Sequence, residues 1–456
     1  QGAPDQALDS LGKLLAHPAA SARDRFQATI LQLQAARTGN AELDSRNQRE
    51  AWERLAQFAQ ADDVVALDSL VLLAQRQLAQ GQKTEDRNQT SDIGDQNSNA
   101  AGSSSPSDFR LLTSDLIKPD ELIHRLESHP LAKAPQRLLA TDLRMQVNPD
   151  QRDALITQAI AEWRNAEASQ LAVLATWLNG KGEFQRVLDE IPLERAIQSR
   201  EVFLQHLDAL GAVGRWDEIK HVLDTERFPL DPVIQRMYLA RANAQLGQDA
   251  ASKNNWQRAL EAAAGDVGKL MTLAEYAEKN GATEIAESAY TQATTAAPKL
   301  RQAWQGRLRS TSASRDTKRI RDLLAEMLKL WPNDPSIQND EAYMRLLLLS
   351  NADPANAELI EIEHLAEELV RRFPASLPHR TLLALARLKQ RRPVAALQAY
   401  DGVQVAANAL TPSALAVHAA TMSANGQVEV AQQEIAQVPA DRLLPEERAG
   451  IANLRE

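Results

Sequence analysis

The chain contains no cysteine among its 456 residues, which excludes disulfides, thiolate zinc sites and cysteine nucleophiles. Its eight histidines are scattered, and such spacing does not predict a metal site. Aromatic residues make up only 4%, and 18 glycines with 20 prolines are few for a β-rich protein of this size. Good helix formers such as alanine, leucine and glutamate are abundant instead. The composition therefore favours helices packed through small residues.

Several functional signatures are also missing from the sequence. No run approaches the 18 apolar residues of a membrane-spanning helix, so no span is predicted. The motifs GxxxxGK[ST], GxGxxG, HExxH and GxSxG do not occur. The net charge of −10, from 51 basic and 61 acidic residues, gives no overall footprint for nucleic acid. These absences predict a protein that is not an enzyme, needs no cofactor and does not bind nucleic acid.

A period of 34 residues is the clearest positive signal. Several columns keep it between residues 231 and 332, namely Gly247, Gly281 and Arg315; Trp256, Tyr290 and Leu324; Ala259, Ala293 and Met327; and Pro298 with Pro332. Agreement of several columns on one period indicates stacked supersecondary units.

The residues of one unit, 267–298, predict a helical hairpin. Leu270, Leu273, Ala274 and Ala277 form one apolar stripe on a first helix, which Gly281 ends because glycine accepts the left-handed conformation of a helix C-terminus. A second stripe runs over residues 285–293 and stops before Pro298. A single hairpin cannot bury both of its sides, so neighbouring hairpins must cover it.

Leu273-Ala274, Gly281, Ala286, Tyr290, Ala293 and Pro298 together resemble the tetratricopeptide repeat (TPR) consensus. The resemblance implies an all-α, right-handed α-solenoid of stacked helical hairpins, with a concave groove that binds ligands and no catalysis of its own. Outside the centre the resemblance weakens. The units around Gly182 and Gly214 are shortened, and Arg391 stands where glycine is usual.

Five regions are expected along the chain. They are N-terminal helical repeats over 1–81 with an incomplete first unit, a low-complexity disordered loop or linker over 82–108, divergent TPR-like repeats over 109–230, the best-matching units over 231–332, and C-terminal units over 333–456 with an extended loop near 351–358. The segment 82–108 holds almost no large apolar residue, so burial cannot offset its ordering entropy. Because the chain starts at Gln1, we expect that a signal peptide, a membrane anchor or another upstream part has been removed.

The TPR resemblance also implies where a ligand would lie, because first helices line the groove in that family. The matching positions of the central units are Met237, Arg241, Met271, Glu275, Gln305 and Arg309. Some TPR proteins hold a peptide's terminal carboxylate with lysine and asparagine at these places, and this chain has neither. Methionines beside charges suit an adaptable peptide surface, but filling of the core is an equal alternative for each of them.

A basic patch interrupts the otherwise acidic chain between Lys299 and Asp322. Its members are Arg301, Arg307, Arg315, Lys318, Arg319 and Arg321. The simpler interpretation is a solvated helical hairpin. The alternative is a docking patch for an acidic protein segment or a polyanion.

The sequence thus predicts a noncatalytic scaffold that binds a partner protein or peptide of unknown identity in the groove of a TPR solenoid. One alternative is an assembly or regulatory subunit of an exported-polymer or secretion machine. Another is the targeting module of an enzyme whose catalytic part lies upstream. The lack of cysteine leans towards an extracytoplasmic or membrane-tethered bacterial protein. Exposed end helices make self-association a further expectation.

Overall fold

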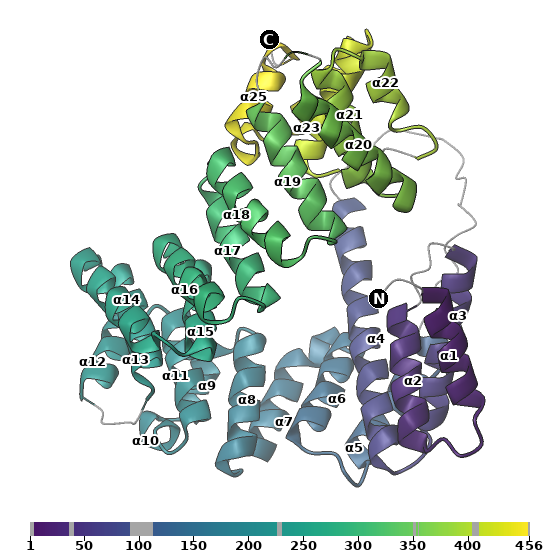
Figure 1. Ribbon diagram of the computed structural model, residues 1–456. Helices are drawn as coiled ribbons and strands as arrows, with labels where there is room; N and C mark the ends of the chain where they lie inside the picture. Colours follow the sequence, from purple (N-terminus) through teal and green to yellow (C-terminus); the bar gives the residue numbers. More distant parts are fainter. Residues whose placement is uncertain are drawn as a thin grey trace. The chain divides into compact units, whose positions relative to one another are not determined.

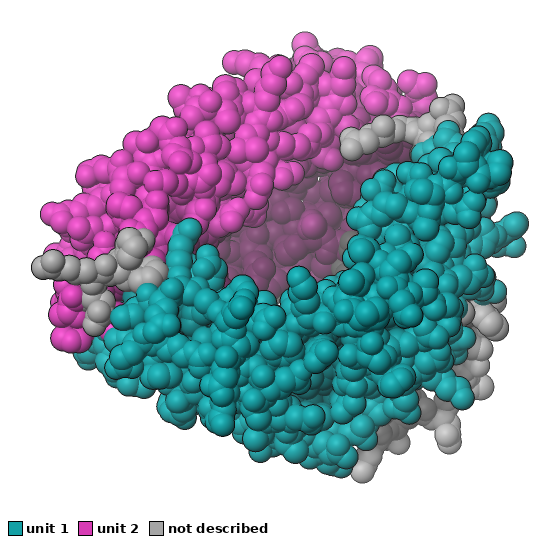
Figure 2. Space-filling model, turned by 90° about the horizontal axis from the view of Figure 1, so that it is seen from below, with its two compact units in different colours: residues 1–219 teal, residues 220–456 magenta. Residues whose placement is uncertain are grey.

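The computed structural model describes residues 4–35, 41–91, 113–225, 230–349, 353, 355–403 and 410–454. Regular structure within these ranges is entirely helical, as the sequence predicted (Figure 1). None of the helices described is both long and apolar enough to cross a membrane. The chain divides into two compact units, residues 1–219 and 220–456, which are coloured separately in Figure 2. Each unit is described by itself below.

The first unit consists of successive antiparallel helices. They are α1 (Pro4–Ala16), α2 (Ala22–Ala35), α3 (Ala41–Phe58), α4 (Val64–Ser91), α5 (Pro119–Ser128), α6 (Ala134–Val147), α7 (Arg152–Trp163), α8 (Ala168–Gly180), α9 (Phe184–Glu190), α10 (Leu193–Ala196) and α11 (Arg200–Ala212), with 3-10 turns at Thr113–Asp115 and Pro149–Gln151. The boundary between the units falls inside α12 (Trp216–Thr225). Helix α9 has seven residues, which agrees with the shortened repeat predicted around Gly182.

The second unit contains the best-matching repeats. Its helices are α13 (Pro232–Gln245), α14 (Asp249–Ala263), α15 (Val267–Lys279), α16 (Thr283–Ala296), α17 (Arg301–Ala313), α18 (Thr317–Leu330), α19 (Pro335–Leu348), α20 (Ala357–Arg372), α21 (Leu377–Lys389), α22 (Pro393–Gln398), α23 (Pro412–Ala424), α24 (Val428–Ala436) and α25 (Pro445–Gly450), with 3-10 turns at Ala440–Arg442 and Ala452–Leu454. The pairs α13/α14, α15/α16 and α17/α18 are TPR-like hairpins that follow the 34-residue period.

Local chemistry sets the ends of the repeat helices. The carboxylate of Asp266 accepts the Lys269 backbone N–H at 3.1 Å and so caps the start of α15. Gly281 follows that helix with φ of +75°, as the sequence predicted. Arg315 and Arg391 occupy the corresponding turns with φ of +56° and +59°. Both arginines therefore adopt the left-handed conformation that glycine takes in the other repeats.

Two expected boundaries differ from the structure. Helix α4 was predicted to end near Gly81, but it continues to Ser91. Residues 82–91 contain no proline or glycine and several good helix formers, so nothing in them stops the helix. The rest of the expected linker, 92–108, lies outside the described residues. The extended loop expected near 351–358 lies slightly earlier, between Leu348 and Ala357, and residues 350–352 and 354 of it are not described.

The core of the second unit is built from clusters that each join neighbouring hairpins. One cluster on α13–α17 centres on Trp256 and the fully buried Tyr290. The next, on α17–α19, holds Trp304 and Ile320, and a third on α19–α23 holds Tyr343. Each hairpin thus buries apolar surface against the one before and the one after, as expected of a solenoid.

Candidate functional site

The predicted groove residues lie on α13, α15 and α17, but they differ in exposure. Met237 is only 3% exposed and belongs to the core cluster that contains Trp256. Met271 is half-buried and packs against the same cluster. The core alternative therefore holds for Met237, whose side chain is not available to a ligand. The apolar character of Met237 alone could not decide between filling of the core and contact with a ligand.

The other four predicted positions reach the surface, and we call them the first-helix face. Glu275, Gln305 and Arg309 are exposed, and Arg241 is half-buried. Arg241, Glu275 and Arg309 are spaced by 34 residues, so they occupy equivalent places on three successive first helices. The Gln302 amide donates a hydrogen bond to Glu275 Oε1 at 3.0 Å, which links α17 to α15. The face thus presents polar side chains whose helices are tied together.

A second link between α15 and α17 comes from Glu278, which the sequence analysis did not single out. Arg309 donates two hydrogen bonds to this carboxylate, from Nε to Oε1 at 3.1 Å and from Nη2 to Oε2 at 3.0 Å. The hydroxyl of Tyr290 donates to the same carboxylate at 2.9 Å. The bond from Arg309 lowers the pKa of Glu278, and burial with the nearby Glu278 charge raises the pKa of Tyr290 to about 12. Around neutral pH Glu278 is therefore a carboxylate, Arg309 a cation and Tyr290 a neutral phenol.

The close approach of α16 and α17 depends on Gly306 in α17. A Cβ atom built on Gly306 would lie 2.3 Å from Cε1 of Tyr290, so the aromatic ring occupies the place of a side chain. Arg309 of the same helix donates a hydrogen bond to the hydroxyl of this tyrosine at 3.3 Å. A glycine inside an otherwise regular helical pattern is visible in the sequence, but only the structure shows that the Tyr290 ring is the reason for it.

The basic patch is mostly neutralised by carboxylates of the same and neighbouring helices. Four of its six members form ion pairs, namely Arg301 with Asp334, Arg307 with Glu326, Arg319 with Glu287 and Arg321 with Asp322. Arg315 and Lys318 are exposed at the turn that starts α18. This pairing supports the interpretation as a solvated hairpin, and docking of an acidic partner here stays a prediction.

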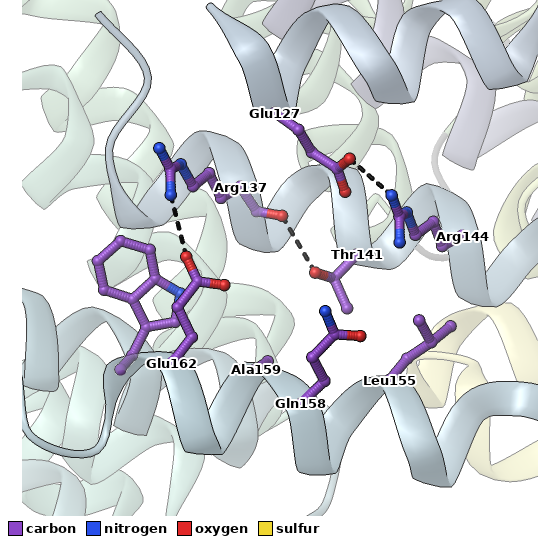
Figure 3. Close-up of a pocket in the computed structure, with 9 residues that line it drawn as sticks. Glu127, Arg137, Thr141, Arg144, Leu155, Gln158, Ala159 and Glu162 are labelled. Carbon is purple, nitrogen blue, oxygen red and sulfur yellow. Dashed lines mark hydrogen bonds and ion pairs between the residues drawn. The ribbon is translucent and has the colours of Figure 1, made fainter.

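A charged pocket in the first unit was not foreseen from the sequence. It has a volume of about 220 Å³ and lies between α5, α6 and α7 (Figure 3), and Trp163 is among its lining residues. Arg144 donates to Glu127 at 2.6 Å and Arg137 to Glu162 at 3.1 Å. Each arginine is matched by one glutamate, so the pocket favours no ion of either sign.

No group of three or more potential metal ligands occurs among the residues that the structure describes.

A further pocket of about 540 Å³ lies between the second helices α14 and α16, where Trp256 and Ile285 contribute apolar surface. It is lined by the turn that contains Gly281 and is therefore formed by two consecutive repeats.

Comparison with known proteins gives distant structural likenesses only. No protein-family model and no curated protein sequence matches the chain. Among solved structures, a chain of the APC/C hetero-tetramer Cut9–Hcn1 is 12% identical with a TM-score of 0.30, covering 99% of this chain and 81% of that one. The TPR domain of P58(IPK) is 12% identical with a TM-score of 0.22, covering 74% and 93%. A chain of Naa15/Naa10 bound to HypK-THB is 12% identical with a TM-score of 0.26, covering 95% and 70%. Similarity at this level carries no argument about partners or activity.

Proposed function

We propose that this chain is a noncatalytic scaffold that binds a partner protein or peptide across the first-helix face of α13, α15 and α17. The observation that carries the proposal is the repetition of Arg241, Glu275 and Arg309 at equivalent places on three successive first helices. Alternating basic and acidic side chains at a regular spacing suit an extended segment with charges in the complementary order.

The links between the repeats support a binding surface that is formed before the partner arrives. The bonds from Gln302 to Glu275 and from Arg309 to Glu278 hold α15 and α17 in one register. A surface already fixed in this way loses less conformational entropy when a partner binds. Because Arg309 keeps Glu278 ionised, this carboxylate is poorly suited to proton transfer near neutral pH, which also favours binding over catalysis.

The test is a crosslinked pull-down of the chain from its native lysate beside a triple variant, Arg241→Ala with Glu275→Ala and Arg309→Ala. A specific protein that is captured by the unchanged chain and lost with the variant is expected. The matched control changes three exposed residues of the second helices, Lys253→Ala, Arg258→Ala and Glu284→Ala.

The control set removes the same two positive charges and one negative charge, so it separates position from net charge. Far-UV circular dichroism must show that both variants keep the helical content of the unchanged chain. Equal capture by both variants would refute the assignment to the first-helix face.

A further inference from the structure

The C-terminal turn of the chain packs against repeats far behind it in the sequence. Helix α25 contains Glu446 and Glu447, and Glu447 is only 5% exposed. The hydroxyl of Tyr343, on α19, donates a hydrogen bond to Glu447 Oε1 at 2.8 Å across 104 residues of sequence. The hydroxyl of Thr317, the first residue of α18, donates to Glu446 across 129 residues. Two neighbouring carboxylates therefore contact two earlier helices.

An apolar side chain accompanies these carboxylates. Leu444 precedes α25, is half-buried, and packs against both the α17–α19 cluster and the α19–α23 cluster. Glu447 Oε2 also accepts the backbone N–H of Leu444 at 2.7 Å, which holds the leucine and the carboxylate in one compact turn. Leucine followed by two glutamates at positions 444–447 thus forms one recognition unit.

The surface that receives this unit is complementary in charge. Glu446 lies at the N-terminus of α18, where the partial positive charge of the helix favours an anion. Asp316 caps that helix by accepting the Arg319 N–H at 3.0 Å, which leaves the Thr317 hydroxyl to Glu446. The N-terminus of α18 therefore faces the carboxylate of Glu446.

Residues beyond the recognition unit are held elsewhere. Ile451 and Leu454 belong to the apolar cluster on α23 and α24, so they anchor the chain end to the last hairpin. Residues 444–447 instead reach α18 and α19 through two hydroxyl contacts and one leucine. Leu443, directly before this stretch, is fully buried in the same cluster as Ile451, so residues 444–447 are anchored at both ends. Their displacement breaks the two hydroxyl contacts and withdraws Leu444 from two clusters whose buried members belong to the hairpins.

We propose that Thr317, Tyr343 and the apolar site of Leu444 form a docking surface for an acidic segment of another protein, and that residues 444–447 occupy this surface in cis. The segment that fits is a leucine followed within three residues by two carboxylates on one helical turn. Such a partner competes with the chain's own C-terminal turn for the same contacts. Thr317 and Tyr343 lie on α18 and α19 and are not members of the first-helix face, so each proposal can fail without the other.

The experiment uses the full chain and a fluorescent peptide that carries residues 440–452. The tethered segment competes at an effective concentration on the order of millimolar, so the unchanged chain should bind the peptide weakly. A chain with Glu446→Ala and Glu447→Ala has a weakened cis segment and should bind the unchanged peptide about tenfold tighter or more, which corresponds to about 1.4 kcal/mol. Adding Tyr343→Phe to this variant should remove most of the gain.

Two controls define the site. Glu429→Ala removes an exposed carboxylate on α24 and should leave peptide binding as in the unchanged chain. A peptide with glutamine at both glutamate positions should not bind the weakened variant. If the peptide still binds tightly after Tyr343→Phe is added, it binds elsewhere and the assignment is wrong. The assignment is also wrong if the chain with Glu446→Ala and Glu447→Ala folds but binds the peptide no more tightly than the unchanged chain.

Hydrogen exchange on the unchanged chain tests whether the peptide displaces the C-terminal turn, even if the double variant does not fold. Saturating peptide should speed the exchange of amides in residues 447–451 while α19 keeps its protection. Unchanged protection of residues 447–451 at peptide saturation would show that the C-terminal turn does not exchange, and the proposal would be wrong.

Discussion

The contact between Gly306 and Tyr290 gives a prediction in which two effects of opposite sign compete. Replacement of glycine by alanine inside an exposed helix stabilises a protein by about 1 kcal/mol, because alanine is the better helix former. By this argument alone, Gly306→Ala in α17 should raise stability. The structure predicts the reverse, since the new Cβ would lie 2.3 Å from Tyr290 Cε1 and 2.4 Å from its Cζ.

The ring cannot move aside at low cost. Tyr290 is fully buried in the α13–α17 cluster, and its hydroxyl donates to the charged Glu278 at 2.9 Å. Overpacking of a core costs about 1–3 kcal/mol, and loss of a hydrogen bond to a charged group costs about 1.5–3 kcal/mol. After subtraction of the helix-propensity gain from the sum of the two costs, we expect Gly306→Ala to destabilise the second unit by about 1.5–5 kcal/mol.

Thermal unfolding followed by circular dichroism measures this change. For a unit of this size each kcal/mol lowers Tm by about 2–4 °C, so about 1.5–5 kcal/mol lowers it by about 3–20 °C. Gly268→Ala in α15 is the matched control, because its Cβ would meet only the Asp266 side chain at an ordinary 3.4 Å. The control should be neutral or slightly stabilising. A Gly306→Ala variant as stable as this control would refute the reasoning.

A double-mutant cycle locates the cause of the effect. Tyr290→Leu removes the ring that meets the new methyl group, so Gly306→Ala should cost less in that background. We expect a coupling free energy of about 1–2 kcal/mol between the two positions. Additive effects would show that the cost of Gly306→Ala arises elsewhere.

Three further changes test other parts of the second unit. Arg391→Gly should raise Tm, because glycine relieves a left-handed backbone conformation that costs about 1 kcal/mol in other residues, and Arg315→Gly should do the same. Glu363→Gln should lower the free energy of unfolding by about 1–3 kcal/mol, as measured in urea, because the buried Glu363 accepts from Arg387 at 3.1 Å and Arg392 at 2.9 Å. Burial alone would raise the pKa of Glu363, but hydrogen bonds and the two arginines outweigh burial and hold the pKa below its ordinary 4.5. The contribution of Glu363 to the free energy of unfolding is therefore complete above pH 4.5 and is lost as the pH falls through the folded-state pKa. The difference between Glu363→Gln and the unchanged chain should accordingly shrink in urea titrations at acidic pH.

The repeat architecture could be predicted because its signals are local or strictly periodic. The apolar stripes of α15 and α16 and the turn at Gly281 were each visible within a few residues of sequence. The left-handed backbone of Arg391 followed from its place in a glycine column, although its residue type argues against that conformation. Met237 shows the limit of such reasoning, because a methionine on a first helix fits the core and a ligand surface equally well until the opposing helix is known.

Charges were harder to interpret, and Glu363 is the clearest case. Within its own helix it stands among other glutamates, a pattern typical of a solvated surface, yet it is 7% exposed. Its partners Arg387 and Arg392 lie 24 and 29 residues further along the chain. A stretch of sequence as long as one helix therefore does not contain the partners of Glu363.

The same reason explains the basic patch, and it suggests a rule for repeats of this kind. Three ion pairs between neighbouring hairpins join residues slightly less than one period apart: Arg301 and Asp334 are separated by 33 residues, Arg319 and Glu287 by 32, and Arg309 and Glu278 by 31. Equivalent positions are 34 residues apart, so lateral neighbours on adjacent helices can fall near that distance. A count of charges along the sequence finds a basic excess, whereas a count of opposite charges 31–33 residues apart finds the partners of Arg301 and Arg319; Arg307 and Arg321 pair within their own hairpin. In a stacked repeat the second count describes the surface better, because the period of the fold, rather than proximity in sequence, decides which side chains meet.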